Sequence, residues 1–527
     1  MKTITSYFIS MFISYIITKV GQKLFWNNKK PDGTIKKPWP PSPKGLPYFT
    51  NAYHQFQEET YRALTRWSNQ LGELFSVEIG FKRIIVLNSP ELVRKLMLEK
   101  DQYNSCRVPS DTFENTVTDR GKTIFSAPFS TYWARLRRAV HLVIGIGHYS
   151  QFEPVLNSQS ETLSACINGS LNEEKKLTGK ELRRLVDLVA ADLALAMVVG
   201  PEKRDPDLML DLVERCRTLE ALQTSKYNRI GQFFPVFNAL YDLFKLITMD
   251  NSVTKTRDDL LQVFIPWFDT IYTQREAVEQ AKKAKNEPFS RVPTIGKSLL
   301  NIDPSKNDPE PVQLTKEEIF INISHITVHA QTYLASTLFT VIQRLATEPE
   351  WQEKILEASG EEQVGVAKAF VYESLRLDAP NKLLAYAPRT DYEFEAPDGH
   401  TYRIDTEAQL VVNVDAIHHN SKYYPNPEKF DPQRFLKSEK KMVSLLQEDQ
   451  TGKKIANDHM AFGAGRRACL GRKISEEFLV TALIHLTQTY KLEGGNVDNK
   501  IEIGTNLWSW TGRTETEGAS IKFVKRQ

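Results

Sequence analysis

The sequence has little cysteine and no metal-binding pattern built from it. Four cysteines are spread over 527 residues, at positions 106, 166, 216 and 469. Cysteines scattered in this way do not make a disulfide framework, so a reducing compartment is expected. The sequence also has no C-x-x-C pair, which argues against the usual structural zinc sites.

An excess of charge of one sign is also lacking. The formal net charge is +3, from 68 Lys and Arg against 65 Asp and Glu. Proteins that bind the phosphate backbone of nucleic acids carry a basic excess, so no nucleic-acid partner is expected. Apolar residues make up 41% and charged residues 25% of the chain, which are the proportions of an ordinary folded globular protein.

Long apolar runs are rare, and the clearest one lies at the N-terminus. Residues 3–18 carry no charged side chain, a length at the short edge of what spans a bilayer. Several lysines follow this run while only Lys2 precedes it, which places the following chain on the cytoplasmic side. We expect residues 1–22 to be a retained transmembrane anchor. The alternatives are an interfacial helix, because Ser and Tyr dilute the apolar residues, and a cleaved signal peptide.

Residues 23–50 are predicted to be a basic and proline-rich hinge. Pro38–Pro47 has five prolines in ten residues, which excludes a helix and favours a stiff extended spacer. Residues 51–527 then form the main domain.

The main domain is predicted to be mainly α-helical with small β-sheets. Residues 74–79 and 83–87 are rich in β-branched side chains and flank a glycine-containing turn, which indicates a hairpin. Residues 89–97 begin with Ser-Pro, which indicates a capped helix. From 150 to 290 the pattern is mostly that of amphipathic helices.

The longest predicted helix starts at a capping box made by Thr315 and Glu318. It continues to residue 347 without Pro or Gly, and a Glu-Pro pair then stops it. About 32 residues give a length on the order of 48 Å, enough to cross a whole domain. His329 and Thr332 place polar groups on one face of this otherwise apolar helix.

The most informative stretch is Phe462–Gly471, with the sequence FGAGRRACLG. Cys469 follows two arginines, and three glycines allow tight turns and close approach to a flat and bulky group. An amphipathic helix is predicted after Gly471. The thiol would therefore lie near a helix N-terminus, where the helix dipole favours a thiolate.

Several roles are open to Cys469 at this point. A zinc ligand would need further ligands, and a nucleophile would need the Cys-His signature of a known enzyme family. A dinucleotide-binding loop would need a strand before Gly463, where the sequence instead indicates a loop. A buried structural cysteine is the simplest alternative. The last is a thiolate ligand of haem iron, with a nearby arginine on a haem propionate.

The decapeptide resembles the haem-binding signature of the cytochrome P450 superfamily, F-G-x-G-x-R-x-C-x-G, at every fixed position. The resemblance implies the P450 fold, in which the long central helix crosses the distal face of the haem. It makes residues 51–527 a haem-thiolate catalytic domain with heme b as its cofactor. Cys469 would be the iron ligand, Arg467 would contact a propionate, and Phe462 would shield the sulfur.

A second motif resembles the propionate-binding pair of this family. Trp133 and Arg137 are four residues apart and share one face of a predicted helix. The resemblance implies that both contact the haem propionates, whereas a basic helix facing solvent is the alternative. Arg389 or His418 is a further candidate for contact with the haem.

Two more motifs precede the cysteine loop in the order that the family shows. Glu373 and Arg376 are three residues apart on a predicted helix, a spacing that alone is typical of a surface pair. Arg434 lies in a proline-pinned loop. The resemblance implies that these three residues form a buried network that braces the haem loop, and it extends over about residues 38–524.

The sequence departs from the family pattern on the distal helix. The family usually shows a small residue, Gly, any residue, an acid and two threonines, where this chain has HAQTYL at 329–334. The acid is absent, and Tyr333 replaces the key threonine unless the register shifts by one residue to Thr332. We expect Thr332 to supply the hydroxyl for proton delivery, helped by His329 or Gln331. Ala330 and Tyr333 are candidate substrate contacts.

Two other segments are candidates for contact with substrate. Residues 233–247 are unusually apolar and aromatic, and both core packing and a membrane-dipping lid are open for them. Leu507 and Trp508, in a predicted turn of the C-terminal strand region, are candidate substrate contacts. Packing at the edge of a sheet is their alternative.

The resemblance implies a monooxygenase that inserts one oxygen atom of O2 into a C–H bond of a lipophilic substrate, such as a steroid, terpenoid or fatty acid. No flavin or nicotinamide site is evident, so the electrons would come from NADPH-cytochrome P450 reductase, with cytochrome b5 as a second candidate donor. Candidates for the basic docking surface are Arg135, Arg138, Arg472 and Lys473. The anchor implies the endoplasmic reticulum membrane. The style of the chain resembles the fungal microsomal branch.

Two other functions stay open. The unusual distal residues favour a haem-thiolate isomerase, dehydratase or peroxide-using enzyme, none of which needs a reductase. A non-enzymatic haem-binding sensor would keep Cys469 but would need no docking surface. Consumption of NADPH in the presence of reductase separates these functions.

Overall fold

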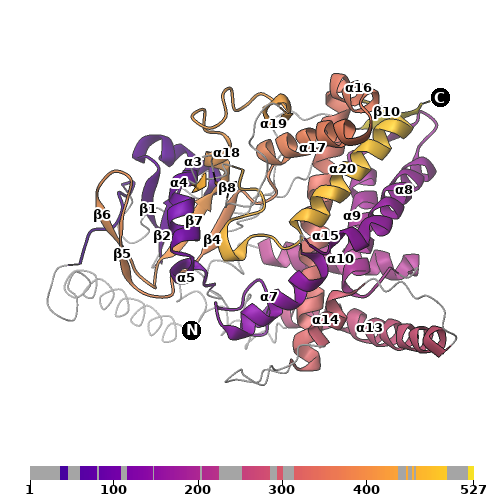
Figure 1. Ribbon diagram of the computed structural model, residues 1–527, viewed down its shortest axis with the longest axis horizontal. Coiled ribbons are helices and arrows are strands. Elements are labelled where there is room, and N and C mark those ends of the chain that lie inside the picture. The colour runs from indigo at the N-terminus through magenta and orange to yellow at the C-terminus, as the bar shows by residue number, and fades with distance from the viewer. Residues whose placement is uncertain are drawn as a thin grey trace, which may run out of the picture.

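The computed structural model describes residues 36–44, 60–79, 82–107, 116–145, 147–201, 204–224, 252–284, 293–300, 314–436, 447–448, 454–455, 459–494 and 520–526. These residues form a large helical part and a smaller part built around a β-sheet (Figure 1). The prediction of a mainly α-helical fold with small sheets is confirmed.

The smaller part contains a four-stranded sheet in the order β1-β2-β7-β4. β1 and β2 pair antiparallel, which confirms the predicted hairpin. β7 is parallel to β2 and antiparallel to β4, so strands from both halves of the chain meet in one sheet. The bounds, with the neighbouring β5–β6 hairpin, are β1 Leu74–Ile79, β2 Lys82–Leu87, β4 Leu383–Tyr386, β5 Tyr392–Glu395, β6 Thr401–Ile404 and β7 Gln409–Asn413.

Short helices surround this sheet, and one of them differs from the prediction. Ser89 caps α4 by accepting a hydrogen bond from Leu92 N, and Pro90 is the first helical residue, as expected. The chain then continues as a π-helix instead of one regular α-helix to residue 97. The bounds are α3 Thr60–Leu71, α4 Pro90–Val93, η1 Arg94–Glu99, α5 Asp101–Asn104 and α18 Val414–His418.

The helical part is organised around the long helix α15, which passes through its middle (Figure 1). Its helices are α7 Thr131–Ile144, η2 Tyr149–Phe152, α8 Glu153–Ser170, α9 Gly179–Val198, α10 Pro206–Thr224, α13 Ser252–Ala284, α14 Ile295–Leu300, α15 Lys316–Thr347, α16 Pro349–Glu357, α17 Gly360–Leu377, α19 Gln433–Leu436, η3 Gly465–Arg467 and α20 Arg472–Thr489. Its strands are β3 Lys176–Leu177, β10 Tyr490–Gly494 and β11 Ile521–Lys525, which form one sheet in the order β10-β11-β3. The strands β8 Gln447–Glu448 and β9 Lys454–Ile455 form a separate two-stranded sheet.

Helix α15 has the start and the length that the sequence predicts. Thr315 Oγ1 accepts from Glu318 N at 3.1 Å, and Glu318 Oε2 accepts from Thr315 N at 2.9 Å, so the capping box is confirmed. The helix is 32 residues long. It packs against α9 along much of its length, and apolar side chains of both helices fill the contact.

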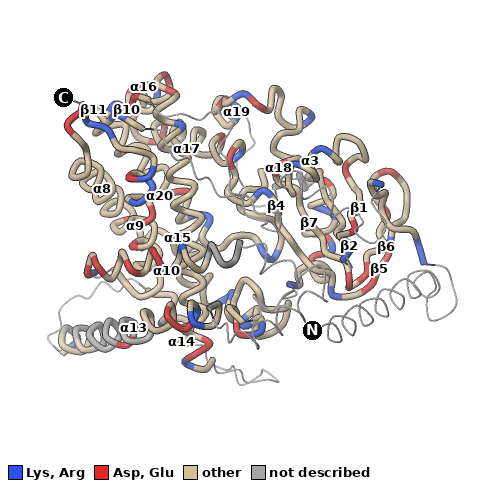
Figure 2. The backbone as a smooth tube through the Cα atoms, turned by 180° about the vertical axis from the view of Figure 1, so that it is seen from behind, with Lys and Arg blue, Asp and Glu red and all other residues tan. Residues whose placement is uncertain are grey.

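Charged side chains are interspersed over both parts of the molecule (Figure 2). Lys and Arg alternate with Asp and Glu along the surface elements, and many form ion pairs, such as Lys354 with Glu350 and Arg215 with Asp211. Such a mixed surface agrees with the small net charge of the sequence.

The proline-rich segment at residues 36–44 lies against the sheet. Ser76 N donates to Pro41 O at 2.7 Å, and Arg403 N donates to Pro38 O at 3.0 Å. The Trp39 ring lies between two guanidinium groups, 4.5 Å from Arg83 and 4.4 Å from Arg403. Backbone hydrogen bonds and cation–π contacts therefore attach this segment to β1 and β6.

Several predictions fall outside the described residues. They concern the anchor at 1–22, most of the hinge at 23–50, the aromatic segment at 233–247, and the candidate contacts Leu507 and Trp508. Among the residues that the structure describes, no helix combines the length and the apolarity needed to cross a membrane.

We predict that Trp39→Ala destabilises the domain by about 1–2 kcal/mol, because each guanidinium loses a cation–π partner. The measurement is the midpoint of urea unfolding followed by tryptophan fluorescence. Trp39→Phe keeps an aromatic face and should lose less than half as much. An unchanged midpoint in Trp39→Ala would show that the segment contributes nothing to stability.

Candidate active site

The cysteine loop between Met460 and α20 is held in a tight backbone conformation. Cys469 N donates to Phe462 O at 2.9 Å, which closes the loop. Gly465 has φ 65°, and a Cβ atom there would lie 2.1 Å from Met97 O. Any side chain at this position would collide with the backbone of the smaller part, so the glycine is needed for close approach.

Cys469 is an exposed residue whose sulfur still has many protein neighbours. Burial among these atoms raises the pKa of the thiol. The backbone N–H groups of Gly471 and Arg472 and the charge of Arg137 lower this pKa, and they do not offset the burial.

By itself, the helix N-terminus does not make Cys469 a thiolate, because burial raises the pKa of the thiol. The dipole of a helix is a modest local effect, whereas desolvation of a buried charge is larger. A cation at the sulfur would be needed to favour the thiolate.

Three arginines gather beside the cysteine loop. Arg467 donates to the carbonyls of Ser105, Ile124 and Ala127, and its guanidinium lies 4.1 Å from the Trp133 ring. Burial, followed by the charge of a neighbouring arginine, lowers the pKa of Arg467 to about 9.

The other two members of this cluster are Arg137 and Arg107. Arg137 Nη2 donates to Ala468 O at 2.7 Å, next to Cys469, and burial lowers its pKa. Arg107 Nη1 donates to Ala385 O, and its guanidinium lies 5.2 Å from the Tyr386 ring. We call Arg107, Arg137 and Arg467 the arginine cluster.

The arginine cluster attracts anions. No ion pair joins any of its three members to a carboxylate within the described part of the chain, and they donate instead to neutral backbone carbonyls. Three half-buried like charges without a counter-ion are unfavourable. A ligand with two carboxylates, such as haem with its propionates, fits this donor set.

The predicted residues Trp133 and Arg389 lie at the edge of this cluster. Trp133 is buried, and its Nε1 donates to Ile124 O at 3.0 Å, so the indole N–H is directed at the backbone. Arg389 is exposed, and its guanidinium lies 6.0 Å from the Phe129 ring, which in turn contacts Trp133. Trp133 carries no charge and its N–H is already bonded, so Arg389 is the one of these two residues that presents a cation at the surface.

The middle of α15 opens toward the same region. From residue 319 to 343 every residue is buried except His329, Ala330, Thr332 and Tyr333. These four are the residues that the sequence placed over the haem. The Phe125 ring lies 4.0 Å from the His329 ring, so this opening adjoins the segment whose carbonyls bind the arginine cluster.

The opening in α15 is aromatic and uncharged. Burial, His325 and Arg107 together lower the pKa of His329 to about 3, so the imidazole is neutral at physiological pH. The Tyr333 ring stacks on His329 at 5.6 Å. A neutral imidazole can pass on a proton or accept a hydrogen bond, but it is not a source of positive charge.

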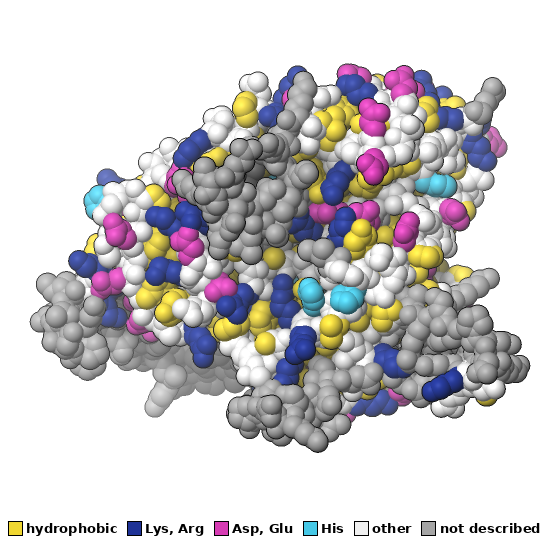
Figure 3. Space-filling view, in the orientation of Figure 1, with side chains coloured by type: hydrophobic (Ala, Val, Ile, Leu, Met, Phe, Trp, Pro, Cys, Tyr) yellow, Lys and Arg dark blue, Asp and Glu magenta, His cyan; other side chains and the backbone are white. Residues whose placement is uncertain are grey.

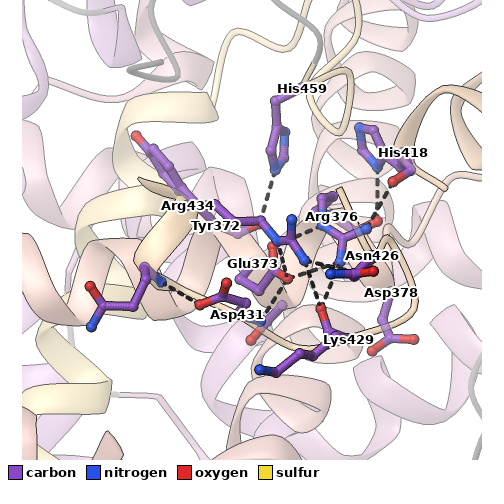
Figure 4. A network of polar contacts seen from close by, with 12 residues as sticks. Tyr372, Glu373, Arg376, Asp378, His418, Asn426, Lys429, Asp431, Arg434 and His459 are labelled. Carbon is purple, nitrogen blue, oxygen red and sulfur yellow. Dashed lines mark hydrogen bonds and ion pairs between the residues drawn. The ribbon is translucent and has the colours of Figure 1, made fainter. Parts of the chain in front are cut away.

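A buried network behind the cysteine loop joins the predicted residues Glu373, Arg376 and Arg434 (Figure 4). Arg376 forms two bonds of 2.8 Å to the Glu373 carboxylate, and both side chains are fully buried. Arg434 Nε lies 3.3 Å from Glu373 Oε1, and Asp431 N donates to the same oxygen at 2.9 Å. The geometry that the resemblance implied is therefore present.

His418 connects this network to the cysteine loop. Its Nε2 accepts from Met460 N at 2.8 Å, so the proton is on Nδ1, which donates to Arg376 O at 2.9 Å. Burial lowers the pKa of His418 well below its usual value, in agreement with a neutral ring. Both nitrogens are used inside the network, and this is where the structure differs from the suggestion that His418 faces the haem.

Arg107 is the main residue of the site that the sequence did not reveal. It lies in an irregular stretch without periodicity or a matching motif, and its position next to Arg467 depends on contacts between distant segments. A lone arginine close to a proline gives no signal that separates it from an exposed charge.

The sequence model of the family described as cytochrome P450 matches residues 40–509. The chain belongs to the cytochrome P450 family. Members of this family bind heme b through a cysteine thiolate.

Curated relatives of this P450 are found in plants and fungi. It is 23% identical to dihydroniloticin synthase CYP71CD1 of Citrus sinensis, over 89% of this chain and 87% of that protein. It is 22% identical to cytochrome P450 monooxygenase 231 of Postia placenta, over 88% and 84%. It is also 22% identical to trans-cinnamate 4-monooxygenase of Catharanthus roseus, over 93% and 92%. The chain is a P450 monooxygenase, an oxidoreductase.

We predict that Glu373→Gln lowers stability by about 3–5 kcal/mol, because it leaves Arg376 buried without its counter-ion. The measurement is the urea midpoint, together with the yield of haem-bound protein. The control is Glu353→Gln, which breaks a partly exposed pair with Arg526 and should cost below about 1 kcal/mol. Equal losses in both variants would contradict the role of the buried network.

We also predict that Cys469 is protonated at neutral pH in haem-free protein, because its pKa is raised. Protein from haem-deficient cells is alkylated with iodoacetamide over a pH series, and the Cys469 peptide is quantified by mass spectrometry. The midpoint should lie above that of the urea-unfolded chain, and Arg137→Gln should raise it further, whereas Arg137→Lys should not. A folded-state midpoint below the unfolded one would contradict the prediction.

Proposed function

We propose that Cys469 is the thiolate ligand of the haem iron and that the arginine cluster binds the haem propionates. The single observation that carries this proposal is the pairing of the exposed residue Cys469 with three guanidinium groups that have no carboxylate partner among the residues the structure describes. Arg137 links the two features, because it donates to Ala468 O beside the cysteine.

The chain's own residues would then have distinct tasks around the haem. The bound haem supplies oxygen activation. The N–H groups of Gly471 and Arg472 stabilise negative charge on the Cys469 sulfur. The buried network holds Met460 and the start of the loop in place. Thr332 offers a hydroxyl at the opening of α15, where a proton can be held.

The substrate is proposed to be lipophilic. Phe125, His329 and Tyr333 form a stack of neutral rings at the opening, and Ala330 beside them leaves space. Such a wall favours apolar or aromatic parts of a substrate over charged ones. A steroid, terpenoid or fatty acid remains the proposed class, and insertion of one oxygen atom into a C–H bond is the proposed reaction.

The electron donor is proposed to be NADPH-cytochrome P450 reductase, with cytochrome b5 as a second donor. Lys and Arg side chains gather over α7 in the view of Figure 3, and Arg138 of α7 is exposed. Arg472 and Lys473 are weaker candidates for docking than the sequence suggested, because they pair with Glu476 and Glu477. A docking site on α7 would lie close to the cysteine loop.

Location in the endoplasmic reticulum membrane, through an anchor at residues 1–22, is part of the same proposal. It rests on the apolar run and on the lysines that follow it.

A second candidate reaction is isomerisation, dehydration or peroxide use, without a reductase. The observation that favours it is the absence of an acid at 329–334, where the family usually carries one.

The test is an optical titration of the ferric protein with steroids, terpenoids and fatty acids, followed by turnover with reductase and NADPH. We predict a saturable low-spin to high-spin shift with one class, and NADPH consumption that forms an oxygenated product. Cys469→Ala should lose the thiolate-type spectrum, whereas Cys166→Ala should keep it. A spin shift with product formed without NADPH would favour the second candidate, and a thiolate spectrum in Cys469→Ala would overturn the proposal.

A further inference from the structure

A buried carboxylate lies next to the distal opening, on a helix that the sequence pattern does not connect with it. Asp187 belongs to α9 and is fully buried. Its Oδ1 accepts from Gln331 Nε2 of α15 at 2.8 Å and from Arg183 Nε at 3.2 Å. Its Oδ2 accepts from Arg217 Nε of α10 at 3.1 Å. Three helices therefore meet at this one carboxylate.

The hydrogen bonds continue from Asp187 to the opening in α15. An ionised carboxylate only accepts hydrogen bonds, so the Gln331 amide must present its NH2 group to Asp187 and its Oε1 to the other side. On that side, Thr332 Oγ1 lies 3.3 Å from Gln331 Oε1 and donates to it. The Gln331 amide therefore connects the buried Asp187 carboxylate to the Thr332 hydroxyl at the opening.

An ion pair that only joins helices would be a weak explanation for Asp187. The carboxylate lies between α9 and α15, in a contact otherwise filled by apolar side chains such as Val186 and Ala190. Apolar residues usually stabilise such a contact as well as a buried ion pair does. The connection through Gln331 to Thr332 suggests a more specific role for the Asp187 carboxylate, which is to orient the Gln331 amide.

We propose that Asp187 is a positioning residue for the distal hydroxyl and takes over, through Gln331, part of the task of the acid that α15 lacks. By fixing the Gln331 amide in one orientation, it holds the Thr332 side chain at the opening. The inference rests on the proposed function, because the opening is assigned there to the distal side of the haem.

The test uses carbon monoxide bound to the ferrous haem of the full chain, because its infrared stretch responds to hydrogen bonding in the distal pocket. Thr332→Ala defines the band without the hydroxyl. Gln331→Leu removes the amide, and Asp187→Asn introduces a side chain that donates as well as accepts, so the Gln331 amide is no longer restricted to one orientation.

We expect the bands of Gln331→Leu and Asp187→Asn to move toward that of Thr332→Ala. The band of the double variant Asp187→Asn/Gln331→Leu should match that of Gln331→Leu alone, because both changes act on Thr332 through the Gln331 amide. The matched control is Ser336→Ala, which removes a hydroxyl that binds Arg183 at the same helix contact without touching Gln331. Its band should remain that of the unaltered protein.

The coupling of NADPH consumption to product formation is a second measurement. Product formed per NADPH should fall about two- to tenfold in Asp187→Asn and Gln331→Leu, the effect of one hydrogen bond on a preferred orientation. The ratio should be unchanged in Ser336→Ala. If Asp187→Asn does not accumulate because Arg217 loses its partner, Asp187→Asn combined with Arg217→Gln replaces it.

An unshifted band in Gln331→Leu, or in the Asp187 variant, would overturn the inference. A shift of equal size in Ser336→Ala would also overturn it, because the effect would then come from general loosening of the helix contact. A protein without any thiolate-type carbon monoxide spectrum would instead contradict the proposed function.

Discussion

The site depends on electrostatic repulsion among three arginines that no carboxylate among the described residues relieves. Arg107, Arg137 and Arg467 converge from three distant segments, and each donates to a backbone carbonyl that supplies no negative charge. Burial and neighbouring arginines lower the pKa of Arg467, which means that its charge is disfavoured there. An anionic ligand removes this penalty, so ligand binding should also stabilise the fold. Under the proposed function, haem bound at this cluster would also couple the sheet part to the helical part.

A second constraint fixes the thiol from the opposite side. The Glu373–Arg376 pair is fully buried, and its contacts join several segments: Arg376 donates to His418 O at the end of α18, and Asp431 N donates to Glu373. His418 links this pair to Met460 by two hydrogen bonds: its Nδ1 donates to Arg376 O, and its Nε2 accepts from Met460 N. One network therefore sets where the loop begins, and α20 sets where it ends. Cys469 lies between two fixed points, a condition that a metal ligand needs.

The predictable parts of the molecule are those governed by local chemistry. The capping box at Thr315, the β1–β2 hairpin and the glycines of the cysteine loop all follow from preferences of neighbouring residues, and the spacing of Glu373 and Arg376 follows from helix geometry. Arg107 could not be found, because its role depends on packing between segments far apart. The helix dipole at Cys469 is visible in the sequence, but the burial that raises the pKa of its thiol is not, so the sequence does not show that the thiolate depends on a cation at the sulfur.

The departure of α15 from the family pattern is the clearest case in which tertiary structure changes the meaning of a sequence. Along α15 the acid of the family pattern is absent. In space, the Asp187 carboxylate, 144 positions before Gln331 in the sequence, is hydrogen-bonded to the Gln331 side chain. Placing the charge behind Gln331, between Arg183 and Arg217, keeps it out of the opening itself. The wall that remains, formed by neutral His329, Tyr333 and Phe125, is compatible with an apolar substrate, which a carboxylate at the surface of the pocket would disfavour.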